Sequence, residues 1–284
     1  MWTEAKLAED LRAIGLREGD AVLAHTSLHA VGSIEGGAET LLRAFRAVLG
    51  SDGTLMVPTF TPDLSDPADW DVSPPRDKLD RRRAEIEVFD PAITPVPTDK
   101  LGVFPEIVRR QVDALRSNHP LSSFAAIGAK ADFLTANAPF HYPLGSESPL
   151  ARLHQLNGWV LLLGVDQRSN SSLHLAEVWA NVPYTHRSAR VKTGPDEWAT
   201  LWGSAECSQG FGKVEPLLRQ ARLLQRGHIG GADSVLMRQR FLISMAVSLL
   251  HGKAEALLCD DPSCRRCTLA RKFTAPSHPP GADL

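Results

Sequence analysis

The chain of 284 residues lacks any apolar run as long as the roughly 18 residues that a membrane-spanning helix needs. Residues 1–10 are polar and lack the apolar core of a signal peptide. With 31 Lys and Arg against 33 Asp and Glu, the chain also lacks the basic excess typical of nucleic-acid binding. The sequence therefore predicts a cytoplasmic protein whose partners are neither membranes nor nucleic acid, and it leaves a homodimer possible.

Three common catalytic motifs are missing as well. The sequence has no G-x-x-x-x-G-K-[ST] phosphate loop, no G-x-G-x-x-G dinucleotide fingerprint and no G-x-S-x-G nucleophile elbow. Without the first two motifs the sequence carries no signature of a nucleotide-binding fold. Without the third, it does not fit a serine hydrolase of the α/β type.

The patterns that are present alternate between helix and strand. Apolar residues at helical spacing predict helices at residues 4–16 and 40–49, and short apolar runs predict buried strands at residues 21–25 and 54–58. Strand, helix and strand in succession form a βαβ unit. We therefore expect an α/β fold whose central sheet is largely parallel and is covered by helices.

An irregular, acidic and proline-rich segment at residues 59–98 interrupts this alternation. Beyond it we expect helices at residues 102–115, 130–136 and 229–250, and strands at residues 123–127, 158–165 and 189–192. The run at 158–165 is apolar throughout, which is typical of a central strand covered on both faces. Because Pro, Gly and Ser predominate near the end, we expect a domain of residues 1–273 and a disordered tail at 274–284.

The strongest catalytic candidate directly follows this central strand. His174 and Glu177 lie three residues apart in Ser171-Ser172-Leu173-His174-Leu175-Ala176-Glu177, so on a helix they share one face. A carboxylate beside a histidine fixes its tautomer and stabilises its charged form, as a general base requires. The alternative is a capped helix whose histidine is only structural.

Two other segments contain histidine, hydroxyl groups and glycine near strands. Residues 25–32 follow the first strand, and their small hydroxyl residues and glycine suit an anion or cofactor cradle, although a plain strand-to-helix loop has the same pattern. His119 precedes Pro120, which favours an extended or turn geometry there. Taken alone, the His119 segment is interpreted as structural.

The chain has four cysteines, and three of them lie close together. Cys259, Cys264 and Cys267 form a C-x4-C-x2-C pattern, and Cys207 is the fourth. In a cytosolic protein four thiols suit a closed, structural zinc site with four cysteine ligands rather than disulfides. The alternative is a set of incidental free cysteines.

The acidic segment at residues 59–98 allows two interpretations. A run of charge is usually a solvated face, but a carboxylate-rich loop would also attract and bind a polyamine.

Several colinear segments together resemble a known family. They are residues 16–28, 53–60, 119–128, 148–153, 160–165, 170–177 and 182–184, and they extend over roughly residues 7–270. In this order they resemble the aminoglycoside 3-N-acetyltransferases, also called the antibiotic N-acetyltransferase family. The resemblance implies a single α/β/α domain, different from the GNAT acetyltransferase fold, with acetyl-CoA as the donor.

The resemblance also implies roles for individual residues. His174 corresponds to the catalytic histidine and Glu177 to its partner acid. The acetyl-CoA cradle corresponds to His25, Thr26, Ser27, Leu28, Val31, Gly32, His119, Ser123 and Phe124. Asp63 and Asp66 are candidates for the acid that meets the antibiotic, and Ser172 or a backbone N–H would stabilise the oxyanion of the tetrahedral intermediate. A zinc-carrying branch of the family has a C-terminal Cys-x-x-Cys and an upstream cysteine, which supports zinc at Cys207, Cys259, Cys264 and Cys267.

The expected activity is therefore acetyl-CoA-dependent N-acetylation of the 3-amino group of an aminoglycoside antibiotic, which confers resistance. Two alternatives stay open: acetyl transfer to a different amine metabolite by the same mechanism, and a CoA-binding member of the family without aminoglycoside activity.

Overall fold

Seven strands form the central sheet of the computed structural model, which describes residues 1–70, 72–203 and 207–274. In spatial order they are β3 (Leu115–Arg116), β4 (Phe124–Gly128), β2 (Thr54–Pro58), β1 (Ala21–Thr26), β5 (Trp159–Leu163), β9 (Ala232–Arg238) and β8 (Gln225–Ile229). The central strand β1 pairs in parallel with β2 and β5, and the outer pairs are antiparallel. The predicted α/β fold is confirmed, but the sheet is mixed, with its parallel part confined to these three central strands.

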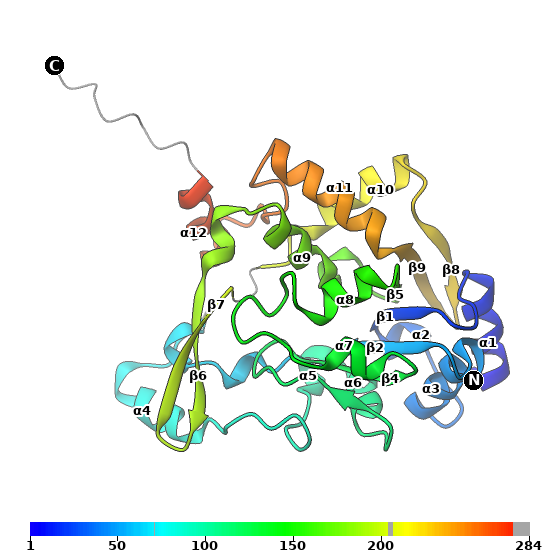
Figure 1. Ribbon diagram of the computed structural model, residues 1–284, viewed down its shortest axis with the longest axis horizontal. Helices are drawn as coiled ribbons and strands as arrows, with labels where there is room; N and C mark the ends of the chain where they lie inside the picture. Colours follow the sequence, from blue (N-terminus) through cyan, green and yellow to red (C-terminus); the bar gives the residue numbers. More distant parts are fainter. Residues whose placement is uncertain (71, 204–206, 275–284) are drawn as a thin grey trace.

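Helices cover both faces of the sheet (Figure 1). One face packs against α1 (Glu4–Ala13), α3 (Ala38–Leu49) and α6 (Val103–Arg109). The other packs against α7 (Ala131–Thr135), α8 (Pro149–Gln155), α9 (Ser172–Trp179), α10 (Glu215–Gln220), α11 (Gln239–Gly252) and α12 (Arg265–Thr274). The layers are therefore those of an α/β/α arrangement.

The apolar run of β5 explains why helices are needed on both sides. Its side chains alternate between the two cores: Val160 and Leu162 enter one, and Leu161 and Leu163 enter the other. All of its residues are buried. Because successive side chains of a strand point to opposite faces, a continuous apolar run needs cover on both.

Short elements connect the longer strands and helices. They are α2 (Leu28–Val31), α5 (Thr98–Leu101) and the 3-10 turns η1 (Pro62–Leu64), η2 (Pro67–Asp69), η3 (Gln167–Ser169), η4 (Pro183–His186) and η5 (Phe211–Val214). No helix within the described ranges is both long and apolar enough to cross a bilayer.

The acidic segment packs against a two-stranded ribbon beside the main sheet. The ribbon pairs β6 (Ser188–Gly194) with β7 (Glu197–Trp202), and the segment contains the helix α4 (Arg76–Glu85), which lies near the ribbon in Figure 1. No residue of α4 is buried. The sequence did not predict this helix because it has no apolar face and therefore no hydrophobic periodicity.

The predicted helix at residues 229–250 is wrong for its first ten residues. Residues 232–238 form β9, which turns back on β8 through Gly230 and Gly231 and pairs antiparallel with β5. Gly230 has φ 59°, a left-handed conformation that suits a tight hairpin turn. Only from Gln239 onward is the segment helical.

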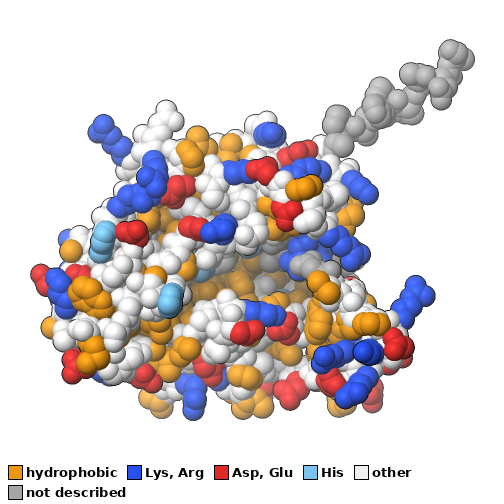
Figure 2. Space-filling model, turned by 180° about the vertical axis from the view of Figure 1, so that it is seen from behind, with side chains coloured by type: hydrophobic (Ala, Val, Ile, Leu, Met, Phe, Trp, Pro, Cys, Tyr) orange, Lys and Arg blue, Asp and Glu red, His pale blue; other side chains and the backbone are white. Residues whose placement is uncertain are grey.

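Two other boundaries differ. The helix predicted at residues 102–115 ends at Arg109, and Leu115 belongs instead to the edge strand β3. The expected tail at 274–284 lies outside the described residues except for Thr274, which ends α12. Seen from behind, the molecule is hollowed near the middle of one face, with hydrophobic side chains in the hollow and Lys and Arg at its edge (Figure 2).

Candidate active site

A cavity of about 690 Å³ lies where β1, β2 and β5 end. Residues from six parts of the chain line it: Ala24 to His29 at the end of β1, Pro58 and Phe60 at the end of β2, Lys100 to Pro105, Val165 to Ser171 in part, His174 on α9, and Ser208 beside Cys207. The carboxyl ends of neighbouring parallel strands are the usual place for ligands in open α/β sheets. The fold thus places His174 at the expected position for chemistry.

His174 and Glu177 form a buried pair on α9. The Nδ1 of His174 lies 2.7 Å from a carboxylate oxygen of Glu177, and the second oxygen accepts a hydrogen bond of 3.2 Å from the hydroxyl of Tyr184. The ring of Phe211 packs against the imidazole, with ring centroids 4.8 Å apart. With Nδ1 held by Glu177, Nε2 is the nitrogen left for a substrate.

The segment after β1 contributes four of its six candidate residues to the cavity. His25, Thr26, Ser27 and Leu28 line it, whereas Val31 is buried in the core beneath α2 and Gly32 ends that helix with φ 88°. Burial lowers the pKa of His25 to about 3, so its imidazole is neutral near pH 7.

Thr26 gives independent evidence that a ligand fits here. Its hydroxyl oxygen is buried and has no hydrogen-bond partner among the described residues, although Thr26 lines the cavity. A buried polar atom normally has a partner. A polar ligand group at the end of β1 would supply one.

The side chains of Lys100 and Arg168 also line the cavity, and the sequence interpretation missed both. Lys100 forms an ion pair with Asp63, and Arg168 forms one of 2.6 Å with Asp166. The position of Arg168 just after a central strand could have identified it. Lys100 gives no such signal, because only the fold brings it to the site.

His119 has a structural role. Its Nδ1 accepts hydrogen bonds from the backbone N–H groups of Leu121 and Ser122, at 3.1 and 2.9 Å, and its Nε2 lies 3.2 Å from the carbonyl oxygen of Phe140. Burial lowers its pKa to about 4. The ring therefore fixes the turn at His119–Pro120 and does not line the cavity.

Ser123 and Phe124 also lie behind the cavity wall. The hydroxyl of Ser123 donates to the carbonyl oxygen of Thr59 at 2.8 Å and accepts from Arg116 at 3.0 Å. The ring of Phe124 packs edge-on against Phe60, with centroids 5.1 Å apart, and only Phe60 lines the cavity. The structure thus places both residues where they support the wall.

The two neighbouring serines at the start of α9 face different surroundings. The hydroxyl of Ser172 is fully buried and accepts a hydrogen bond of 3.0 Å from the side-chain amide of Gln239, away from the cavity. Ser171 lines the cavity, and its hydroxyl lies 3.4 Å from Nε2 of His25. Of the two, Ser171 is placed to contact a substrate.

The candidate acids Asp63 and Asp66 differ in accessibility. The carboxylate of Asp66 is buried and pairs with Arg83 and Arg190, each at 3.0 Å. Burial raises its pKa, but the hydrogen bonds from Arg83 and the Ala68 N–H and the two positive charges outweigh it, so the net pKa is lowered. Asp66 therefore joins the acidic segment to the ribbon, whereas the carboxylate of Asp63 is 54% exposed.

Replacing Asp66 by Asn should lower the free energy of unfolding by about 1–3 kcal/mol, because two arginines lose a charged partner. A carboxyl group whose pKa is lowered by folding stabilises the fold at pH values above its pKa in the unfolded chain. It loses that contribution as the pH falls through its pKa in the folded chain. Denaturant unfolding of both proteins should therefore show a constant difference near neutral pH that shrinks below about pH 4. Asp63→Asn, at an exposed pair, is the matched control, with an expected change of about 0–1 kcal/mol. A difference that grows on acidification would contradict this role.

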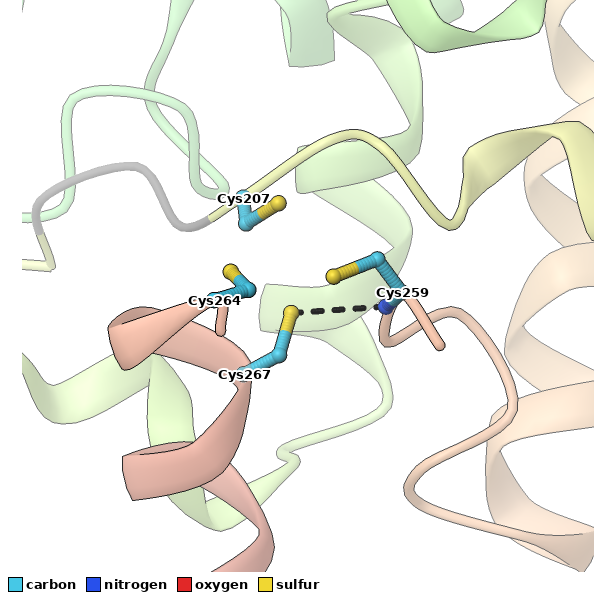
Figure 3. A group of neighbouring side chains, drawn as sticks. All are labelled: Cys207, Cys259, Cys264 and Cys267. Carbon is cyan, nitrogen blue, oxygen red and sulfur yellow. Dashed lines mark hydrogen bonds between the residues drawn. The ribbon is translucent and has the colours of Figure 1, made fainter. Parts of the chain in front are cut away.

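All four cysteines lie together (Figure 3). Their sulfur atoms lie within 4.8 Å of one another, contributed by the loop after β7, the loop before α12 and the first turn of α12. The N–H of Cys259 donates to the sulfur of Cys267 at 3.3 Å, and the N–H of Gln209 donates to that of Cys207 at 3.4 Å. Four-coordinate zinc with Zn–S bonds of about 2.3 Å separates its sulfurs by roughly 3.8 Å, which this spacing fits.

The chain is similar to known proteins of one family. A family model described as aminoglycoside 3-N-acetyltransferase matches residues 23–251. The chain is 37% identical over 270 residues to aminoglycoside N(3)-acetyltransferase VII of Streptomyces paromomycinus, covering 88% of this chain and 92% of the relative.

Solved structures give the same result. The apoenzyme of the aminoglycoside acetyltransferase AAC(3)-IVa matches with a TM-score of 0.82 and 32% identity, over 96% of this chain and 97% of that chain. A histidine-to-alanine mutant of AAC(3)-IVa has been solved in complex with a gentamicin. AAC-IIIb, in a binary complex with CoASH, matches with a TM-score of 0.76 and 30% identity, over 89% of this chain and 97% of that chain. Since the family model spans residues 23–251 and a 37% identical relative covers 88% of the chain, the protein belongs to the aminoglycoside 3-N-acetyltransferase family.

Proposed function

We propose that this protein transfers the acetyl group of acetyl-CoA to the 3-amino group of an aminoglycoside and so confers resistance to that antibiotic. The observation that carries the proposal is the His174–Glu177 pair, 2.7 Å apart, at a cavity of about 690 Å³ beyond the central parallel strands. The curated relatives with this activity and the CoA-bound and gentamicin-bound neighbours support it.

The proposed chemistry needs no covalent enzyme intermediate. The amine nitrogen attacks the carbonyl carbon of the thioester, and Nε2 of His174 accepts the amine proton. The C–S bond then breaks, and the proton passes from His174 to the sulfur of CoA. Glu177 orients the imidazole and stabilises its positive charge, while Tyr184 holds the second oxygen of Glu177.

The cavity suits acetyl-CoA in both polarity and charge. Apolar side chains of Leu28, Phe60 and Val103 line it together with the cationic side chains of Lys100 and Arg168. Phosphates of CoA would bind the cations, and the pantetheine arm would contact the apolar wall and the unpaired hydroxyl of Thr26. Of the nine residues expected to form the cradle, His25, Thr26, Ser27 and Leu28 are the ones proposed to touch the donor.

Asp63 is the acid proposed to meet the acceptor. Its carboxylate is 54% exposed, so an ammonium group of an aminoglycoside could replace Lys100 as its partner. Asp66, which pairs with Arg83 and Arg190, is proposed to stabilise the fold and not to contact the acceptor.

The direct test is acetylation of a panel of amines by the purified protein. We expect release of CoA thiol with gentamicin, apramycin or sisomicin, and one added acetyl group located at the 3-amino nitrogen by NMR.

Raising salt from about 0.05 to 0.5 M should raise KM for the aminoglycoside, because the screening length between charges shortens to a few Å. Unchanged KM would indicate a neutral or anionic acceptor.

One observation favours a smaller amine metabolite as the alternative acceptor. Because Asp66 is already neutralised by two arginines, the acidic segment offers a polycation less charge than its composition suggests. Turnover of a monoamine in the panel, with no turnover of any aminoglycoside, would favour that alternative. Binding of acetyl-CoA with no acceptor turned over would instead indicate a CoA-binding member without this activity.

We also propose that Cys207, Cys259, Cys264 and Cys267 bind one structural zinc ion, as in a zinc-carrying branch of the family. Their sulfurs lie within 4.8 Å of one another, and two accept backbone N–H groups, as thiolate ligands commonly do. None of the four lines the cavity that contains His174. The ion would therefore cross-link the chain and take no part in acetyl transfer.

The compartment proposed for this activity is the cytoplasm. The four cysteines are free, which fits a reducing environment, and acetyl-CoA is available there. A homodimer is an expectation from the sequence that light scattering on the purified chain would test.

A further inference from the structure

Attack on a thioester places negative charge on the carbonyl oxygen, and a hydrogen-bond donor at that position lowers the barrier. The backbone of α9 does not offer one in its first turn. The N–H groups of Ser172 and Leu173 donate to the side-chain and carbonyl oxygens of Asn170, each at 3.2 Å, and the N–H of His174 donates to the carbonyl oxygen of Ser171 at 3.1 Å. These three groups are already occupied.

The hydroxyl of Ser172 is also unsuitable. It is fully buried on the far side of the helix, where it accepts from Gln239 at 3.0 Å. A side chain on the cavity wall is therefore a better candidate donor than either of these groups.

Ser171 meets the geometric requirement. It has helical backbone angles, φ −61° and ψ −19°, and lies three residues before His174, so the two side chains share one face of the helix. Both side chains line the same cavity. The hydroxyl of Ser171 and the imidazole of His174 are therefore both available to a ligand in that cavity.

The imidazole of His25 is the hydrogen-bonding neighbour of that hydroxyl. Its Nε2 lies 3.4 Å from the oxygen of Ser171, at the end of the neighbouring strand β1. If the imidazole donates N–H to this oxygen, the proton of Ser171 is free to point into the cavity. Since burial lowers the pKa of His25 to about 3, the ring is a poor base, which argues against activation of Ser171 as a nucleophile.

We propose that Ser171 is a catalytic residue whose hydroxyl, oriented by His25, donates a hydrogen bond to the carbonyl oxygen of acetyl-CoA. This role rests on the proposed acetyl transfer. As the amine nitrogen bonds to the carbonyl carbon, that oxygen becomes an oxyanion and the bond from Ser171 strengthens. When the C–S bond breaks, the C=O bond re-forms and Ser171 keeps its proton, while the amine proton moves through His174 to the CoA sulfur.

Ser171→Ala should lower kcat by about 10²–10³ with little change in KM for either substrate, as for loss of one oxyanion donor. Ser171→Thr, which keeps a hydroxyl, should restore most of kcat. The matched control is Ser148→Ala, which removes a buried hydroxyl that caps α8 by accepting from the Ala151 N–H at 3.2 Å. It should lower the melting temperature and leave kcat unchanged.

A second measurement does not depend on any acceptor. Infrared difference spectra of acetyl-CoA labelled with ¹³C at the carbonyl should show a lower C=O stretching frequency when bound to the wild type than to Ser171→Ala. Wild-type protein that binds acetyl-CoA but acetylates no amine would count against the proposed function, and the frequency shift would still decide the role of Ser171. Equal kcat and equal C=O frequency in Ser171→Ala would overturn the inference, as would a burst of CoA and an acetylated Ser171 without acceptor.

Discussion

His174→Ala should lower kcat by about 10²–10⁴ and leave the affinity for acetyl-CoA nearly unchanged, because the variant loses the base but keeps the cavity wall. The imidazole lies on the wall of the cavity and its Nδ1 is held by Glu177 at 2.7 Å, so the remaining nitrogen can accept a proton only from a ligand in that cavity. Steady-state kinetics with both substrates, together with calorimetric titration of acetyl-CoA, would measure the two effects separately.

Two variants give this experiment its controls. Glu177→Gln keeps a hydrogen-bonding partner for the imidazole and should lower kcat less than His174→Ala. The reason is that Glu177 orients the base and does not itself accept the amine proton. His251→Ala, at the exposed end of α11, removes a histidine distant in sequence from the site and should behave as the wild type. A His174→Ala enzyme with near-wild-type turnover would require another base.

The sequence predicted that His174 and Glu177 form a pair because the geometry of that pair is local. His174 and Glu177 are three residues apart on one helix, and this spacing alone places them on one face. The four residues of the β1 end that line the cavity were also predictable, since the ends of parallel strands converge on ligand sites. The structure distinguishes the two serines: Ser171, three residues before His174, lines the cavity with it, whereas Ser172, two residues before it, is buried away from the cavity.

The positions of the other candidate residues, and of Lys100, depend on contacts between distant parts of the chain. Asp66 looks like a free loop acid in the sequence, but Arg190, 124 residues later, pairs with it across the ribbon. Lys100 reaches the cavity only because α5 and α6 pack beside the end of β1. His119, Ser123 and Phe124 lie near the cavity, yet their side chains face the backbone and the core behind it. None of these orientations follows from spacing.

In the fold too, some elements could be predicted from the sequence and others could not. The strand at β5 is recognisable from an apolar run that both cores require. The segment that became β9 is also apolar and continues directly into α11, so periodicity alone did not separate the two, and only pairing with β5 and β8 fixes it as a strand. α4 is invisible for the opposite reason, because a helix without buried residues carries no hydrophobic pattern.

Protein purified without added zinc should contain about one zinc ion per chain, with Zn–S distances near ~2.3 Å by X-ray absorption. The expectation rests on four sulfurs within 4.8 Å of one another, which come from segments more than 50 residues apart in the sequence. Apolar burial of α12 is small, since Leu269 and Phe273 are exposed and Cys267 and Ala270 are its buried residues. Hydrogen bonds of Arg271 to Cys259 and of Thr274 to Glu255 add to this attachment. A closed thiolate site would therefore supply much of the free energy that holds α12 in place.

Cys264→Ser removes one ligand and should lower the melting temperature by roughly 10 °C, as expected for a loss of several kcal/mol in a chain of this size. Ser263→Ala, at the preceding residue, changes no sulfur and should melt within about 2 °C of the wild type. Because none of the cysteines lines the cavity, kcat per folded Cys264→Ser molecule should change little, which separates a structural ion from a catalytic one. Chelation should lower the melting temperature of the wild type, and addition of zinc should restore it. Neither treatment should change the melting temperature of Cys264→Ser. Metal-free protein with unchanged stability would show that these four cysteines cluster without binding zinc.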